Sequence, residues 1–528
     1  MTFFDNRVAV NCTASKDYPT AVPFHPPERY PEYRGSETDP GNAIYGEVRE
    51  TLRRLGLDAD NFGTPNWNPF RGIVRPGMTV FIKPNTVNHD HPGDENIFSV
   101  IVHASILRPV LDYVCIALGG RGKIIIGDSQ IIFGEFDKAM HVSQIEGLLD
   151  WYRSNCPIPL ECFDLRVVRG TRSWLYGKWA RVPVEQDPEG YQAVDLGEKS
   201  CFVGIDPKRL RIAIASYKNM YRYHSEGRHQ YVFPRSFLQS DAVISIPKLK
   251  THRRTAVTLA LKNFMGIPAL KDCLPHFITG SVAEGGDQYI HPSLRKRICL
   301  YLHDIIQSSP YMPVKLLCAI VKRLVWDSHK IVPFKDDVYE AMWYGNDTLW
   351  RTLFDLNRIV FYADKEGQIH DVPQRTFFCL VDGIIAGEKD GPVNPDPVHA
   401  GVLMAGFNPV SVDAVATTLM GFDIDKIPLV YRAFDYGNTV GPHLGGRRSD
   451  IRVLDGGRTC DLENYKQYRN LNFVPHPTWV GHVELQPQSD GGGHGTRHRV
   501  PEAEKELRGS RAGNGAVQGG PVPREVGL

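Results

Sequence analysis

Residues 79–129 decide the fold and read TVFIKPNTVNHDHPGDENIFSVIVHASILRPVLDYVCIALGGRGKIIIGDS. They begin with a short apolar strand pattern over residues 79–82, and a helical pattern follows over residues 99–118. The glycines Gly119 and Gly120 are typical of a helix end, and residues 123–126 form a second β-rich run. A strand, a helix and a strand in this order predict a βαβ unit with parallel strands and a right-handed crossover.

The rest of the chain continues the alternation of strands and helices. Residues 242–246 are continuously apolar between Asp241 and Pro247, which is typical of a buried parallel strand. Further strand patterns lie at 8–10, 160–164, 210–214, 377–382 and 402–405. Further helical patterns lie at 43–55, 136–152, 349–360 and 412–420. The alternation predicts an α/β protein with a largely parallel sheet flanked by helices and with β-hairpin and helical insertions.

The composition suggests how these elements are divided. We expect residues 1–77, an N-terminal strand and helix with a loop insertion, to belong to a main domain over 78–435. Insertions in that domain are expected at 165–208 and 292–362, and an extension over 436–485 is expected to pack on it. From about residue 486 glycine, arginine and proline occur without apolar periodicity, so a disordered tail is expected over 486–528.

Charge and hydropathy exclude several classes of partner. The chain has 61 Lys and Arg against 60 Asp and Glu, so no overall attraction to nucleic acid is expected. No apolar run approaches the ~20 residues of a spanning helix, and the N-terminus does not resemble a signal peptide. Residues 311–326 form an amphipathic pattern containing Lys315 and Lys322, which we expect to pack into the core rather than lie on a surface.

Ten cysteines occur without any Cys-x-x-Cys spacing. Zinc ribbons and ferredoxin-type clusters need that spacing, so no intrinsic iron–sulfur cluster is expected. Free thiols and a cytoplasmic location are the expectation.

Residues 245–266, SIPKLKTHRRTAVTLALKNFMG, form the most informative polar segment. If the strand continues past Pro247, its period of two places Lys248, Lys250 and His252 on one side. A helix is expected next, and Gly266 would end it. Its core stripe would contain Val257, Leu261, Phe264 and Met265, and its other face Thr255, Thr258 and Lys262.

Polar residues also follow other strands of the expected sheet. Lys83 and Asn85 follow the first strand, Asp128 the second, Asp382 and Glu388 a later one, and Asp413 lies near a helix start. In parallel sheets ligands bind beyond the carboxyl ends of the strands, so we expect these residues and the 248–263 segment at one rim. Each residue alone also fits a turn, a helix cap or a salt bridge.

Lysines, a histidine and carboxylates at one rim suit chemistry on a small phosphorylated or carboxylated molecule, assisted by Mg²⁺ or another divalent metal. His252 is the candidate acid or base, because imidazole titrates near neutral pH, and Lys250 is its catalytic partner. The substrate-binding candidates are Lys83, Asn85, Lys248, Thr258, Lys262 and Asn263. The metal-ligand candidates are Asp128, Asp382, Glu388 and Asp413. His276 is a further residue that could lean over the site.

These segments together resemble the family catalogued as domain of unknown function 362, over roughly residues 78–435. The resemblance rests on Lys83-Pro84-Asn85, Gly127-Asp128, Pro247-Lys-Leu-Lys-Thr-His252, Lys262-Asn263, Gly266, Asp382-Gly383, Gly391-Pro392, Asn408-Pro409, Asp413 and Gly421. The family is named for lacking an assigned activity, and many relatives carry a ferredoxin-like segment whose cysteines have no match here.

Two alternatives to an enzyme of anionic substrates follow from this resemblance. The chain could be a non-catalytic cofactor-binding or accessory protein that works with an iron–sulfur or other redox partner. The overall pattern is also distantly similar to the amino-terminal domain of nickel-pincer lactate racemases, although the paired catalytic histidines of that family find no match.

Overall fold

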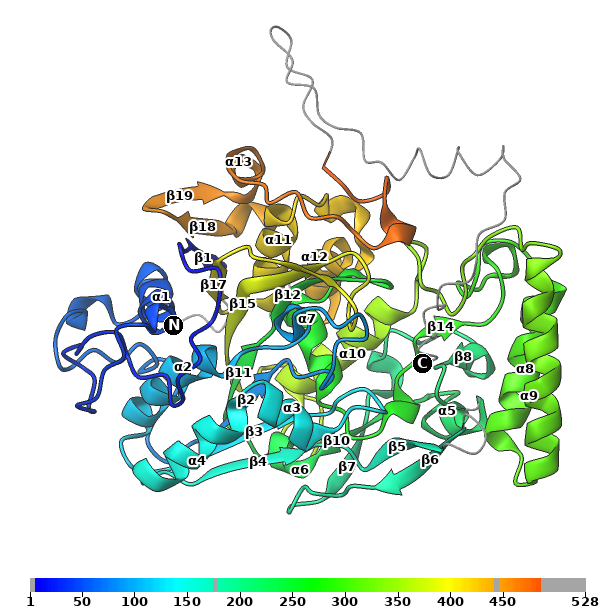
Figure 1. The fold of residues 1–528 in the computed structure, drawn as a ribbon, viewed down its shortest axis with the longest axis horizontal. Helices are drawn as coiled ribbons and strands as arrows, with labels where there is room; N and C mark the ends of the chain where they lie inside the picture. The colour runs from blue at the N-terminus through cyan, green and yellow to red at the C-terminus, as the bar shows by residue number, and fades with distance from the viewer. Residues whose placement is uncertain (1–4, 174–177, 216, 441–445, 486–528) are drawn as a thin grey trace, which may run out of the picture. The chain divides into compact units, whose positions relative to one another are not determined.

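The protein is built on one large β-sheet, shown in Figure 1. The computed structural model describes residues 5–173, 178–215, 217–440 and 446–485. The main strand order is β19-β18-β1-β17-β15-β11-β2-β3-β4. Their bounds are β1 Arg7–Cys12, β2 Thr79–Pro84, β3 Lys123–Asp128, β4 Leu160–Asp164, β11 Ala242–Ile246, β15 Thr376–Glu388, β17 Val402–Gly406, β18 Arg452–Asp455 and β19 Arg458–Asp461. Three short strands join it, β12 Lys248–His252, β13 Ala256–Val257 and β16 Asp396–Val398.

One half of the sheet is parallel, as the sequence predicts. Strand β2 pairs in parallel with β3 on one side and with β11 on the other. Strand β4 pairs in parallel with the far edge of β3, and β15 with the far edge of β11. The helix α2, Ala104–Leu118, connects β2 to β3 and ends at Gly119, whose φ is +57°. The expected βαβ unit is therefore confirmed.

The other half of the sheet is mixed and joins the two ends of the chain. Strand β17 runs antiparallel to β15, and β1 runs antiparallel to β17 with Val8 opposite Gly406. The other edge of β1 pairs in parallel with β18, with Arg7 opposite Arg452. The first strand of the protein therefore lies between two strands formed by residues after 400.

Helices cover both faces of the sheet and bury two cores. Alternation along β2 sends Val80 and Ile82 to one core and Phe81 to the other. The first core contains residues of α1 Ala43–Arg54, α2 and α4 Ile145–Asn155. The second contains residues of α7 Leu259–Asn263, α10 Leu349–Tyr362, α11 Pro409–Leu419 and α12 Pro428–Val440. This is the α/β architecture expected from the sequence, and residues Met1–Glu484 form one compact unit.

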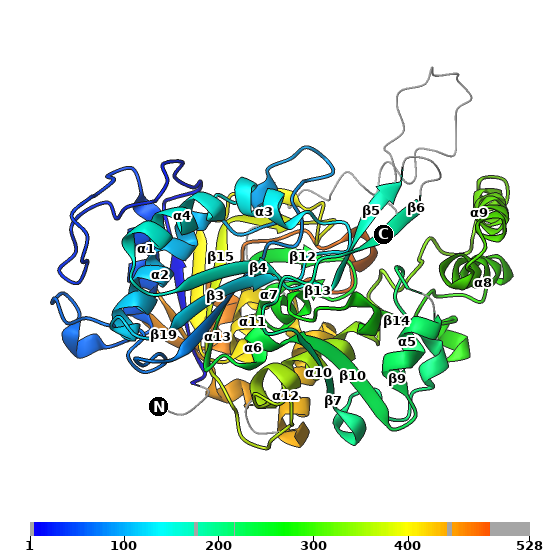
Figure 2. The same ribbon diagram turned by 90° about the horizontal axis from the view of Figure 1, so that it is seen from below.

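Smaller elements are added to this framework. A hairpin of β5 Val168–Ser173 and β6 Lys178–Pro183 is followed by a small sheet of β7 Tyr191–Asp195, β9 His224–Ser225 and β10 Arg228–Pro234. Two helices, α8 Leu294–Ser308 and α9 Met312–Asp327, lie side by side at one edge of the unit (Figures 1 and 2). The remaining elements are α3 Phe136–Val142, α5 Tyr217–Tyr223, α6 Arg235–Leu238, α13 Leu462–Tyr468, β8 Leu210–Arg211 and β14 Phe277–Ile278.

Several local expectations were wrong. The helix expected over 136–152 is divided into α3 and α4, because Gln144 adopts a left-handed conformation with a φ of +62°. The strand expected over 210–214 is limited to β8. The helix expected after β12 is only α7, since Val257 belongs to β13 and Thr255 precedes that strand.

The largest difference concerns α9. It corresponds to the amphipathic pattern at 311–326, yet none of its residues is buried, so the expected core packing is wrong. No described helix combines the length and the apolar character that crossing a membrane requires. The tail expected over 486–528 lies outside the described residues.

Candidate functional site

Strand β12 continues the direction of β11 beyond Pro247 and carries the central polar residues. It pairs in parallel with β15, placing Lys248 opposite Asp382 and Lys250 opposite Gly387. All five residues of β12 are buried. The expected continuation of the strand is confirmed, but it places the two lysines inside the protein.

Lys248 and Asp382 form a buried ion pair with a tyrosine. The Nζ of Lys248 lies 2.9 Å from Oδ2 of Asp382 and donates a hydrogen bond of 2.7 Å to the hydroxyl of Tyr18. That hydroxyl donates to Oδ1 of Asp382 at 2.6 Å. Burial lowers the pKa of Lys248, and the attraction of Asp382 opposes that shift. Both charges are satisfied within the fold, which favours a structural role for Lys248.

Lys83 and Asp128 form a second buried pair at the ends of β2 and β3. Their Nζ and Oδ2 atoms lie 3.0 Å apart, and Oδ2 also accepts hydrogen bonds from the amide and hydroxyl of Thr86. Gly266 packs directly against the pair. A Cβ at Gly266 would lie 2.3 Å from Oδ1 of Asp128, so only glycine fits at this position.

Lys250 connects three chain segments that are far apart in the sequence. Its Nζ donates to the carbonyl oxygens of Val100 at 2.6 Å and Pro392 at 2.9 Å, and to Oδ1 of Asn85 at 3.3 Å. Burial, then the charges of Lys262 and Lys248, lower its pKa well below the usual value.

The amide side chain of Asn263 and the hydroxyl of Thr258 complete the buried network. Asn263 donates to the carbonyl of Lys83 at 3.0 Å and to the hydroxyl of Ser245 at 2.9 Å. The hydroxyl of Thr258 donates to the carbonyl of Thr251. Asn263 and Thr258 therefore hold the backbone around the site.

The four carboxylates expected to bind a metal are not brought together. Asp413 accepts hydrogen bonds from the amides of Ala260 and Leu261 at the start of α7, and burial raises its pKa to about 8. Glu388 lies at the end of β15 and accepts from the amide of Val474. Among the described residues no group of three His, Cys, Asp or Glu side chains is arranged to hold a metal ion.

Four basic residues at the end of β12, in the turn after it and in α7 form what we call the cationic cluster, which consists of His252, Arg253, Arg254 and Lys262. Within the described part of the chain, Glu340 is the one carboxylate at ion-pair distance from it, 3.5 Å from Arg254. The Nε of Arg253 is buried without a hydrogen-bond partner. The cluster therefore carries an excess of positive charge.

Lys262 is the least satisfied member of the cluster. Across the described residues its Nζ forms no hydrogen bond or ion pair, and its side chain is only partly buried. Burial and the charges of Arg254 and Arg253 lower its pKa to about 7. An amine of this kind changes its charge near neutral pH and would gain from a bound anion.

His252 in the cluster and His276 near it have defined tautomers. The Nδ1 of His252 accepts a hydrogen bond from the amide of Arg254 at 3.0 Å, so the ring proton lies on Nε2. The Nδ1 of His276 lies 2.8 Å from the carbonyl of Leu274 and must donate to it, which leaves Nε2 as an acceptor. Burial and neighbouring cations lower the pKa of His252 well below its usual value and that of His276 to about 3. Both rings are neutral at physiological pH, so the geometry favours a hydrogen-bonding role for His252.

Tyr18, Arg253 and Arg254 belong to the site but were not predicted from the sequence. The two arginines lie within residues 245–266 and directly follow His252. This position was the feature of the sequence that could have indicated their role. Nothing in the sequence around Tyr18 indicates its contact with Asp382, because the two residues are 364 positions apart.

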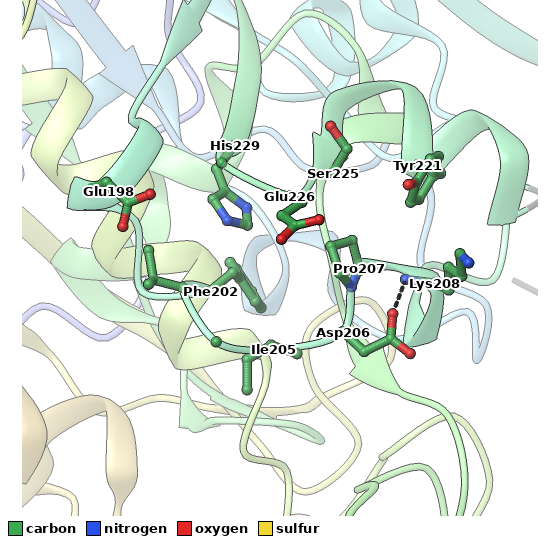
Figure 3. Close-up of a pocket in the computed structure, with 13 residues that line it drawn as sticks. Glu198, Phe202, Ile205, Asp206, Pro207, Lys208, Tyr221, Ser225, Glu226 and His229 are labelled. Atoms are coloured by element: carbon green, nitrogen blue, oxygen red, sulfur yellow. Dashed lines mark hydrogen bonds between the residues drawn. The ribbon is translucent and has the colours of Figure 1, made fainter.

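A cavity of about 530 Å³ lies elsewhere in the unit and is shown in Figure 3. Its lining includes Phe202 and Glu198, together with His229 from β10. The Nδ1 of His229 contacts the Nδ1 of His224 at 3.2 Å. None of the site residues expected from the sequence lines this cavity.

Comparisons with known proteins match the central part of the chain. No curated protein matches the sequence, and no solved structure matches the fold. A family match covers residues 208–418, which contain β12, the cationic cluster and Asp413 but not Lys83 or Asp128. The model that matches is that of the family described as Domain of unknown function (DUF362), so the resemblance expected from the sequence is confirmed over residues 208–418.

Proposed function

We propose that the protein is an enzyme that binds a small phosphorylated or carboxylated molecule at the cationic cluster. The observation that carries the proposal is the unpaired charge of Lys262. Its amine has no anionic partner among the described residues, and the two nearby arginines add further positive charge. Unbalanced charge is costly inside a protein unless a ligand compensates it, so the cluster suits an anion.

The residues of the cluster would have separate roles. Arg253 and Lys262, which are both only partly buried, would contact the anion, and Arg254 would add to the field behind them. The Nε2–H group of His252 would donate a hydrogen bond to a ligand oxygen. Lys262, with a pKa of about 7, would accept or release a proton during the reaction.

His276 would accept a hydrogen bond at the site, because its Nε2 is left as an acceptor in the neutral ring. Lys248 and Lys250 would hold the chain segments around the site in place, since their amines are already hydrogen bonded within the protein. No metal is assigned to Asp128, Asp382 or Asp413, because each already accepts hydrogen bonds from buried donors.

Calorimetric titration of the full chain with inorganic phosphate and with malonate tests the binding step. Lys262→Met should weaken binding by about ten- to a hundredfold, the loss of one charge-assisted hydrogen bond. Lys138→Met is the matched control, because Lys138 is an exposed lysine of α3 whose side chain is 60% accessible. Circular dichroism would confirm that both variants are folded. Absence of binding to the unsubstituted protein, or equal binding by both variants, would contradict the proposal.

The catalytic step needs a separate measurement. The protein would be incubated with a mixture of phosphorylated and carboxylated metabolites, and consumption of individual compounds would be followed by mass spectrometry. We expect turnover by the unsubstituted protein and by Lys138→Met, and none by Lys262→Met. Anion binding without turnover of any compound would count against the enzymatic half of the proposal.

We further infer a reducing, cytoplasmic location from the cysteines. The cysteines form no disulfide within the described part of the chain. Fractionation of cells that express the chain would test this location, and recovery outside the cytoplasmic fraction would contradict it.

A further inference from the structure

The helices α8 and α9 form a hairpin whose outer surface is apolar. They are joined by three residues and lie side by side at the edge of the unit in both views (Figures 1 and 2). Leu317, Ile320 and Leu324 lie on one side of α9 at helical spacing and are 62%, 50% and 67% exposed. On α8, Leu294 and Tyr301 are 70% and 67% exposed.

The exposed apolar stripe of α9 differs from the stripe of an ordinary surface helix. A helix at the surface of a globular protein turns its apolar stripe to the core and its polar side to water. In α9 no residue is buried, and the stripe faces solvent. An exposed apolar patch of this kind marks an interaction site.

The inner side of the hairpin is fixed to the rest of the unit. The Nζ of Lys296 lies 2.6 Å from Asp336, and Arg211 lies 3.2 Å from Asp304. The ring of Trp326 packs on that of Tyr339 with centroids 5.0 Å apart. The outer side is therefore presented in a fixed orientation.

The hairpin is also basic, in a chain whose overall charge is close to zero. Its two helices contain six basic residues and two acidic ones. The basic residues are Arg295, Lys296, Arg297, Lys315, Lys322 and Arg323, and the acidic ones are Asp304 and Asp327. The whole chain has a formal net charge of only +1.

We propose that the outer surface of the α8–α9 hairpin docks on an anionic lipid membrane. The exposed leucines and isoleucine would enter the boundary between headgroups and acyl chains. The exposed basic side chains Arg297 and Arg323, which are 61% and 62% accessible, would contact lipid phosphates. Charge complementarity favours this occupant, because a membrane surface combines anionic headgroups with an apolar layer beneath them. The proposal is independent of the cationic cluster and its ligand.

Co-sedimentation of the full chain with lipid vesicles tests this docking. Binding is expected to vesicles that contain phosphatidylserine, and it should weaken strongly with phosphatidylcholine alone or at high salt. The triple variant Leu317→Ser, Ile320→Ser, Leu324→Ser should lose at least about tenfold in partition coefficient, since three aliphatic groups no longer enter the lipid.

A matched control replaces exposed aliphatic residues outside the hairpin. Val282, Val372 and Val480 are 53%, 62% and 51% exposed, and their triple change to serine should leave vesicle binding unaltered. Circular dichroism would show that both triple variants are folded, as expected for changes at exposed positions.

Three results would overturn the proposal. The first is a failure of the unsubstituted chain to bind vesicles that contain phosphatidylserine, and the second is binding of the hairpin variant as strong as that of the parent. The third is a dimer in light scattering that the hairpin substitutions convert to a monomer, which would make the surface an interface between two copies.

Discussion

Replacing Lys248 by methionine should destabilise the protein severely, because Asp382 would remain as a buried charge without its cation. Both side chains are 0% exposed, and the ion-pair distance is 2.9 Å. The hydroxyl of Tyr18 would be the one side chain left donating to Asp382 among the described contacts. Breaking a buried pair in this way costs about 3–5 kcal/mol.

The free energy of unfolding would be measured by urea denaturation followed by tryptophan fluorescence. Total stabilities are about 5–15 kcal/mol, so the loss in Lys248→Met is a large part of the whole. The double variant Lys248→Met, Asp382→Asn should be less destabilised than the two single variants together, by at least about 1 kcal/mol, because it removes both charges.

Lys138→Met again provides the control, since it removes a lysine from an exposed ion pair of 2.8 Å with Glu135. An exposed pair contributes less than about 1 kcal/mol, so this variant should unfold almost like the parent. If Lys248→Met were equally mild but lost phosphate binding, Lys248 would be a ligand residue and its structural assignment would be wrong.

Three further predictions follow from the same site. Lys250→Met should lower the free energy of unfolding by about 2–5 kcal/mol in urea denaturation. The reason is that three oxygen atoms inside the protein lose the lysine that donates hydrogen bonds to them. An unchanged stability would contradict this prediction. Malonate affinity in calorimetry should fall as the pH rises through about 7, where Lys262 loses its proton while malonate keeps both charges. The contribution of Lys262 to stability should rise from pH 7 towards 10.5, because the unfolded chain holds that proton longer. A flat malonate affinity profile would exclude Lys262 as the anion ligand. Gly266→Ala should lower the stability by about 1–3 kcal/mol in thermal denaturation, because the new Cβ would lie 2.3 Å from Asp128. The control Gly147→Ala in α4 should not lower the stability. Similar losses of stability in both variants would refute the steric argument.

The parallel half of the sheet could be predicted because its signals are local. The apolar runs of β3 and β11 are short, continuous and bounded by polar or turn residues, so each strand is recognisable on its own. The position of β1 between β17 and β18 could not be predicted, since pairing between distant segments leaves no periodicity in either. The break at Gln144 was equally hidden, because a residue other than glycine rarely adopts a positive φ.

The convergence of the site was predictable, but its chemistry was not. Parallel strands end at one edge of a sheet, and Lys248 and Asp382 do meet there. Whether two opposite charges bind each other or a ligand depends on distances of a few ångströms, which the sequence does not contain. The same limit applies to α9, whose pattern is amphipathic whether Leu317 faces the core or the solvent.

The place of β1 in the sheet has a consequence for biosynthesis. Residues 7–12 leave the ribosome early, but their partners Val402–Gly406 follow roughly 400 residues later. At typical rates of translation this delay lasts about 20 to 80 seconds. Throughout that interval the emerging chain exposes an unpaired apolar strand, so chaperones that hold emerging chains should associate with this protein longer than with one whose strands pair with segments close in sequence.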